Sequence, residues 1–188
     1  MVFSLLTVVF YTASSLGDKY ISAKLACSAQ EFSFLVALST AFFLTLVLPF
    51  TGWNFAFSLQ SGLALVVLVA LKIAEFYTSA ALLKTVSAYE LKAWLSLNVI
   101  ISYLVDLARG TETFFWAFLP CAAVLVAGIG LVAFGEKREK LLRYILLSII
   151  YIASKFLYGL QMNVLEGTSP VCVLLLVMLG VALLQLPF

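Results

Sequence analysis

The chain has 188 residues, of which 64% are hydrophobic and 11% are charged, and its formal net charge is +2. Soluble domains are about 45–50% apolar, so this composition excludes an ordinary soluble globular protein. A charge so small and so scattered excludes a nucleic-acid partner. The sequence has no His, which excludes Ser-His-Asp catalysis and the usual zinc sites. We therefore expect no enzyme activity, no metal and no cofactor.

Apolar segments of about 20 residues, the length of one helical crossing of a bilayer, recur along the chain. Backbone groups in lipid must satisfy one another, so these segments are predicted to be helices. Pro49, Gly52 and Asn54 are expected to break the uncharged stretch 32–71 into two spans. The fold class is thus all-α, a polytopic membrane helix bundle with the lipid bilayer as a partner. The seven predicted spans are 3–23, 31–50, 56–80, 87–107, 114–134, 141–161 and 169–188.

A short phrase occurs twice, as Tyr11-Thr-Ala-Ser14 and as Tyr151-Ile-Ala-Ser154. Each copy lies in an apolar segment that leads through a polar corner into a second apolar segment ending in Leu-Pro-Phe. We interpret this pattern as an internal duplication. Five predicted spans precede the charged linker, so the second unit enters the membrane from the opposite side. The repeat is therefore predicted to be inverted, which is typical of transporters.

The predicted organisation has three parts. A first five-helix repeat covers 1–135, a charged linker covers 136–140, and 141–188 forms the opening helix pair of a second, incomplete repeat. Two interpretations of the missing helices stay open. The chain is either a transporter cut short or a natural short form that a partner completes.

Polar residues at the spacing of one helical face occur in the first span and at matching positions of the sixth. Ionisable groups inside a span cost about 2.5–3.5 kcal/mol each on insertion scales, so they are expected to face a cavity or a partner. Across an inverted repeat the two stripes would face each other. They comprise Tyr11, Ser14, Ser15 and Asp18, and Tyr151, Ser154, Lys155 and Tyr158.

Three further ionisable groups have two interpretations each. Lys155, near the middle of its span, either lines a cavity or extends along its stem to an interface, and the distance from both span ends favours the cavity. Lys72 and Glu75, three residues apart, are either a self-neutralising pair or part of a proton or ligand site. In the second case Glu75 would change partners as the bundle moves, and Glu75 and Asp18 would be candidate proton carriers.

The fourth span presents Trp94, Asn98 and Ser102 at intervals of four residues. This mixed aromatic and amide face suits a small organic solute, which it would stack against and hydrogen-bond. An Asn inside a membrane helix also joins helices to one another. Both interpretations stay open.

In these features the chain resembles the EamA-type transporters of the drug/metabolite transporter superfamily. The resemblance covers the whole chain and rests on the order and spacing of several short motifs rather than on any one. It implies two inverted five-helix halves that move metabolites, amino acids or drug-like compounds by alternating access, whereas this chain ends after seven spans. The motifs are the first helix pair, Tyr77-Thr-Ser-Ala80, Thr85-Val-Ser-Ala88, Asp106 at the end of the fourth span, and Gly167-Thr-Ser-Pro170 before the seventh.

The first hypothesis is a secondary transporter, and more specifically an exporter, of small polar metabolites or amino acids in a bacterial plasma membrane. The alternative is a non-transporting membrane fragment or subunit, completed as a homodimer or by a partner that supplies the missing helices. The predicted substrate cavity consists of Tyr11, Ser14, Ser15, Asp18, Lys72, Glu75, Trp94, Asn98, Tyr151, Lys155 and Tyr158.

The orientation in the membrane has two conflicting indications. The resemblance implies a cytoplasmic N-terminus. Basic residues near the predicted loops gather on the other side of the membrane, as Lys84, Lys137 and Arg138 do. By the positive-inside rule this distribution indicates an external N-terminus.

Overall fold

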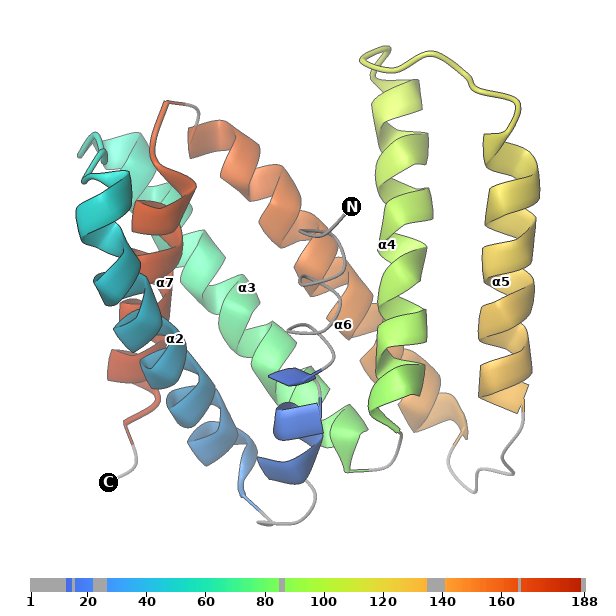
Figure 1. Cartoon of the computed structure of the whole chain (residues 1–188), viewed down its shortest axis with the longest axis horizontal. Coiled ribbons are helices and arrows are strands. Elements are labelled where there is room, and N and C mark those ends of the chain that lie inside the picture. Colours follow the sequence, from blue (N-terminus) through green and yellow to red (C-terminus); the bar gives the residue numbers. More distant parts are fainter. Residues whose placement is uncertain are drawn as a thin grey trace.

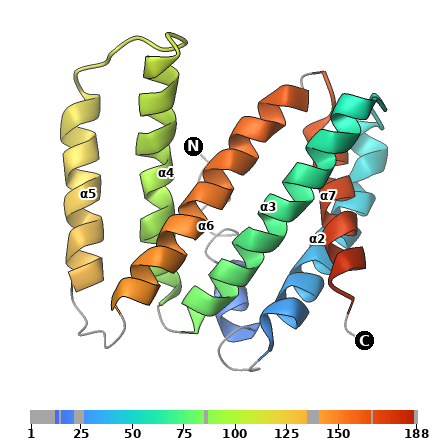
Figure 2. The ribbon, with the colours of Figure 1, turned by 180° about the vertical axis from the view of Figure 1, so that it is seen from behind.

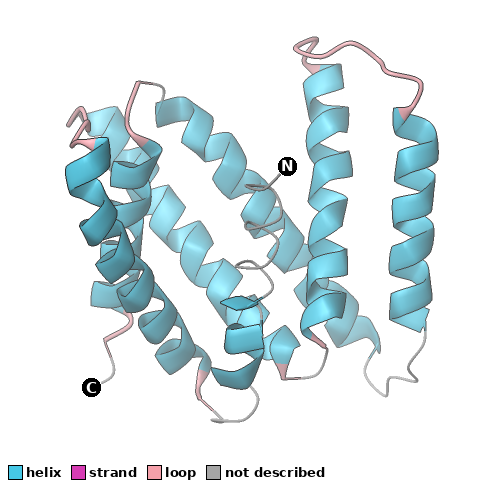
Figure 3. Ribbon diagram, viewed as in Figure 1, coloured by secondary structure: helices cyan, strands magenta, loops and turns pink. Residues whose placement is uncertain are grey.

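The computed structural model describes six ranges of the chain, and inside its helices a few side chains are left undescribed. Within these ranges the protein is helical and has no strand, which confirms the all-α prediction (Figure 3). Tyr11, Ser15 and the charged linker lie outside the described residues. The described ranges are 13–14, 16–21, 27–84, 87–134, 141–165 and 167–186, without the side chains of 88–89, 92–94, 132–134 and 141–144.

In the described ranges, six α-helices follow the short helical segment 16–21, and a 3₁₀ helix, η2, follows the fifth of them. Four match the second, third, fourth and sixth predicted spans to within a few residues. The first predicted span lies mostly outside the described residues. The helices are α2 (Ala29–Thr51), α3 (Leu59–Leu83), α4 (Ala88–Ala108), α5 (Phe118–Phe134), α6 (Leu141–Met162), η2 (Asn163–Leu165) and α7 (Pro170–Leu184).

Two predicted boundaries were wrong. The fifth span starts at Phe118 and not at 114, because the preceding residues form a loop that Tyr103 holds in place. The seventh helix ends at Leu184 and not at 188. The predicted break between the second and third spans is confirmed: Pro49 lies in the last turn of α2, and the chain leaves the helix at Gly52, whose φ of 74° is a conformation that glycine adopts readily.

Serine residues start three of the helices. The Ser28 hydroxyl accepts a hydrogen bond from the Glu31 N–H, and the Glu31 carboxylate accepts one from the Ser28 N–H, so the two residues form a capping box at α2. Ser58 and Ser61 form the equivalent box at α3. Ser87 caps α4 through the N–H of Glu90. Each cap satisfies an amide that a helix start otherwise leaves without a partner.

Three described helices are long and apolar enough to cross a membrane. They are Ala29–Thr51, Leu59–Leu83 and Ile145–Leu165, with mean hydropathies of 2.1, 1.8 and 1.5. Helix α7 and segments of α4 and α5 are also apolar but shorter than a full crossing. By length and composition, the protein is therefore suited to a membrane.

The helices pack in two main pairs, α3 with α6 and α2 with α7. Figure 1 shows α2, α3 and α7 grouped together, with α6 between them and the α4 and α5 pair; Figure 2 shows the same order from behind. The buried core lies in the first group. Among its fully buried side chains are Ala37 of α2, Leu68 of α3, and Val173, Val177 and Val181 of α7.

Helices α2 and α7 run antiparallel and are hydrogen-bonded at both ends. Near the start of α2, the Gln30 side chain donates to the Leu186 carbonyl after α7, at 3.3 Å. After the end of α2, the Asn54 side chain donates to the Gly167 carbonyl at 3.0 Å, and the Ser169 N–H donates to the Asn54 carbonyl at 2.8 Å. The two helices that the predicted duplication relates thus contact each other in opposite directions.

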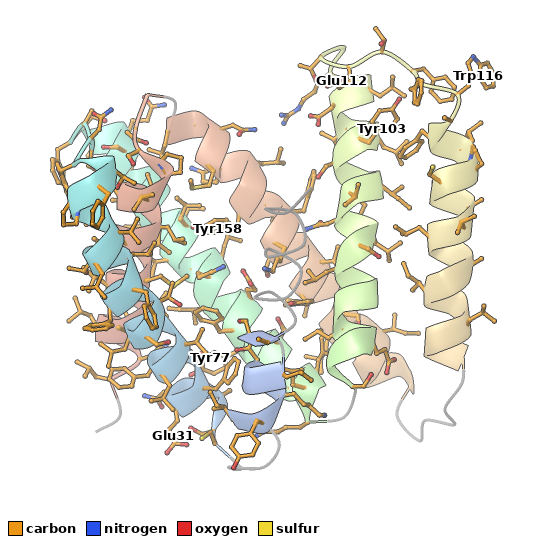
Figure 4. The ribbon with its side chains drawn as sticks, viewed as in Figure 1. Glu31, Tyr77, Tyr103, Glu112, Trp116 and Tyr158 are labelled. Atoms are coloured by element: carbon orange, nitrogen blue, oxygen red, sulfur yellow. The ribbon has the colours of Figure 1, made fainter. Side chains whose placement is uncertain are left out.

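Helices α4 and α5 stand beside α6 and are joined by a loop that Tyr103 anchors (Figure 4). The Tyr103 hydroxyl donates to the Thr113 carbonyl at 3.1 Å and accepts from the Phe115 N–H at 2.8 Å. Its ring lies 4.1 Å from the ring of Phe118, centroid to centroid. One side chain of α4 therefore holds both the loop and the first residue of α5.

We expect Gly180→Leu to lower the free energy of unfolding by about 1–3 kcal/mol, the usual cost of overpacking. A Cβ at Gly180 would lie 2.9 Å from the Val69 Cγ2, where α7 and α3 touch. Gly62→Leu on α3 is the matched control, because a Cβ there meets nothing within 4 Å. Thermal unfolding of both purified proteins in detergent measures the difference. Equal midpoints would contradict this close contact.

Candidate functional site

A buried carboxylate, that of Glu75 on α3, contacts two ammonium groups. The Lys72 Nζ lies 2.9 Å from the Glu75 Oε2, and the Lys155 Nζ on α6 lies 2.8 Å from the Glu75 Oε1. The Glu75 side chain is 7% exposed, that of Lys72 11% and that of Lys155 30%. The three groups, here called the Glu75 triad, together carry one excess positive charge.

Aromatic rings surround the more deeply buried ammonium group. The Lys72 Nζ lies 4.9 Å from the ring centroid of Tyr158 on α6 and 5.4 Å from that of Phe76 on α3. A ring face attracts a cation electrostatically and more strongly where water is excluded. Tyr158 (labelled in Figure 4) thus stabilises Lys72 from α6, while Glu75 stabilises it from α3.

A cleft of about 310 Å³ lies beside the triad, between α4 and α6. Lys155 is the triad member that lines it, so the more exposed of the two lysines faces this space. Polar groups make up much of the remaining wall, and they come from both helices. The lining residues are Asn98, Ser102, Val105 and Asp106 of α4, Lys155, Phe156, Gly159 and Leu160 of α6, and Asn163 of η2.

Two buried polar atoms near this region have no hydrogen-bond partner within the described part of the chain. One is the Asn98 Oδ1, on the α4 wall of the cleft, and the other is the Tyr158 hydroxyl. A buried polar group left without a partner costs about 1–3 kcal/mol, so such groups call for a ligand, a water or an undescribed side chain.

The structure brings together some predicted site residues and separates others. Lys72, Glu75, Lys155 and Tyr158 meet in and around the triad, and Asn98 lines the adjoining cleft. The prediction that Lys72 and Glu75 form a pair is confirmed. The ion pair between Glu75 and Lys155 joins two helices that the sequence analysis had not placed in contact.

The remaining predicted residues are placed less centrally or are not described. Ser14 is exposed and Asp18 half-buried, both near the segment 16–21, and Tyr151 is buried in the core. Tyr11, Ser15 and the side chain of Trp94 lie outside the described residues. Ser154, in the same stripe, donates to the Ile150 carbonyl of its own helix at 2.8 Å.

Seven of the nine lining residues were not among the predicted cavity residues, and two of these seven, Asp106 and Asn163, are polar groups that the predicted face of the fourth span did not include either. Asp106 follows Asn98 and Ser102 at further four-residue steps, so the same helical face extended by one turn identifies it. Asn163 lies just beyond α6, in η2, where the helical spacing that begins at Lys155 still holds. Both signals were present in the sequence.

Comparison of the chain with protein-family models, with curated proteins and with solved structures finds no match. The resemblance to EamA-type transporters therefore stays a prediction that rests on the short motifs. The geometry itself supports one chemical description, a polar cleft with a cationic group on one wall inside an apolar helical bundle.

We expect Glu75→Gln to destabilise the protein more than Lys155→Met. The first change leaves two ammonium groups without their carboxylate, and breaking a buried pair in this way costs about 3–5 kcal/mol. The second leaves the neutral pair of Lys72 and Glu75 intact. The midpoint of thermal unfolding in detergent measures both.

The double variant Lys72→Met with Glu75→Gln serves as the control for this comparison. It leaves one ammonium group, that of Lys155, which lines the cleft and is 30% exposed, so water is able to solvate it. It should therefore recover most of the stability that Glu75→Gln loses. If Glu75→Gln alone is no less stable than Lys155→Met, the carboxylate does not hold the triad together.

Proposed function

We propose that the protein is a multi-pass membrane protein that works as a secondary transporter of small polar solutes. The observation that carries this proposal is the Glu75 triad beside a polar cleft. Charged groups inside apolar helices are expensive, and they are typically kept where they line a solute or ion pathway. A purely structural bundle needs no such groups.

The triad also has the form of a two-state element. Lys72 and Glu75 belong to α3, so their contact survives a movement of the whole helix, whereas the contact between Glu75 and Lys155 joins α3 to α6. A displacement of α6 would break only the second contact. Glu75 would stay neutralised while Lys155 was released toward the cleft. Alternating access requires two arrangements of similar energy, and this exchange supports it.

The packing of α2 against α7 supports the inverted repeat within this proposal. The predicted duplication relates these two helices to each other. The start of α2 is hydrogen-bonded to the end of α7, and the end of α2 to the start of α7, so the helices run in opposite directions. Transporters built from inverted repeats place the solute near the middle of the membrane, between the repeats. A bacterial plasma membrane and export as the direction of transport follow from the family resemblance alone.

We expect Lys155→Ala and Glu75→Gln each to reduce flux by at least tenfold in proteoliposomes. The first removes the cation that faces the cleft, and the second removes the carboxylate that holds that cation. Flux is measured as the uptake of a mixture of radiolabelled neutral amino acids and small organic acids. The uptake is measured against an imposed concentration gradient of the same compounds. Flux is normalised to folded protein.

Lys84→Ala is the matched control for this experiment. Lys84 is exposed at the end of α3 and does not line the cleft, so flux should stay near that of the parent protein. Full activity of folded Lys155→Ala would exclude Lys155 from transport. An absence of flux in the parent protein would argue against the transporter proposal as a whole.

The proposed membrane topology makes a separate prediction. Thr51 at the end of α2 and Glu112 after α4 should label from one side of the membrane, and Lys84 after α3 from the other. Single-cysteine variants at these positions, with Cys27, Cys121 and Cys172 replaced by Ser, are treated with an impermeant maleimide in sealed vesicles. Labelling of all three positions from the same side would contradict a multi-pass arrangement.

A further inference from the structure

The two walls of the cleft between α4 and α6 carry opposite charges, with Lys155 on the α6 side and Asp106 on the α4 side. Glu75 supplies one negative charge to two lysines, so the triad keeps one positive charge. Lys155 carries the exposed part of this charge, because its side chain is 30% exposed whereas that of Lys72 is 11% exposed. The Lys155 ammonium has three N–H donors, and its ion pair with Glu75 is made to a single carboxylate oxygen. N–H donors are therefore left for a solute. This part of the cleft therefore favours an anionic group.

The opposite wall offers a different kind of group. The Asn98 Oδ1 is buried and has no donor among the described residues, and Asn98 lines the same cleft as Lys155. Ser102 follows one turn later on the same face. The Asp106 carboxylate, a further turn along, adds another acceptor. This wall favours a solute that donates hydrogen bonds.

We propose that the cleft binds a solute in which a carboxylate is adjacent to a donor, either an ammonium or a hydroxyl group. The carboxylate pairs with Lys155, and the donor bonds to the Asn98 Oδ1. The volume of about 310 Å³ lies at the lower end of the range for small-molecule pockets, which suits a small amino or hydroxy acid. This inference rests on the proposed function in that it names the class of solute that the transporter would carry.

Two matched sets of compounds test the proposal. The first set is leucine, its hydroxy acid analogue, isocaproate and isoamylamine; the second is alanine, lactate, propionate and ethylamine. Within a set the side chain is constant, and only the carboxylate or the donor is missing. Binding to the purified full chain in detergent is measured from the concentration dependence of its thermal unfolding midpoint.

In at least one set, we expect the amino and hydroxy acids to bind at least fivefold more tightly than the simple carboxylate, as one hydrogen bond to a buried acceptor predicts. The amine alone should not bind. Lys155→Met should abolish binding of every carboxylate compound. Asn98→Leu should bring the affinity for the amino acid down to that for the simple carboxylate.

Two variants control for changes in folding. Lys84→Met removes an exposed lysine, and Asn54→Leu removes an asparagine that bonds to the Gly167 carbonyl away from the cleft. Both should keep the parent order of affinities even where the unfolding midpoint falls. An Asn54→Leu protein that lost this order would overturn the assignment of the donor to Asn98.

The outcomes separate the solute site from transport. Selective binding that depends on Lys155 and Asn98 supports the site even if proteoliposomes show no flux, which would count against the transporter alone. Flux with equal affinities for the compounds of each set overturns the site and leaves transport standing. If no carboxylate compound of either set raises the unfolding midpoint, the proposed solute class is wrong.

Discussion

The structure depends on the contact of one carboxylate, that of Glu75, with two lysines in an apolar interior. Opposite charges attract far more strongly in such a medium than in water, and an unpaired charge is correspondingly costly. The carboxylate therefore determines which faces of α3 and α6 meet. The same contact sets the ring of Tyr158 over Lys72 and leaves Lys155 at the edge of the cleft.

Most of the helices were predictable from the sequence because their cause is local. A run of apolar residues of bilayer length indicates a helix without knowledge of its neighbours, and Ser28 and Ser58 start helices through contacts with residues three positions away. The pairing of Lys72 with Glu75 is local in the same sense. The helix boundaries that were predicted wrongly depend on contacts with residues further away along the chain. The hydroxyl of Tyr103, for example, holds the residues before α5 outside the helix.

The candidate site was only partly predictable. Helical periodicity indicated that Lys155 and Tyr158 share a face with Tyr151, but it does not indicate which other helix packs against that face. The predicted duplication suggested the first span as the partner, and most of that span lies outside the described residues; α3 supplies a carboxylate that Lys155 contacts. The placement of Asn98 was likewise only partly predictable. Its spacing indicated a polar face, and only the arrangement of α4 beside α6 places that face on a cleft.

The antiparallel contact of α2 with α7 limits how this region can change during evolution. Its hydrogen bonds lie at the two ends, at Gln30 and at Asn54, while small and branched side chains such as Ala37 and Val177 fill the middle. Substitutions in the middle are constrained by volume alone, so apolar residues of similar size can replace one another. At the ends the constraint is chemical, because an apolar replacement would leave carbonyl groups unsatisfied. Related sequences should therefore drift freely along the centre of this pair and stay polar at its ends.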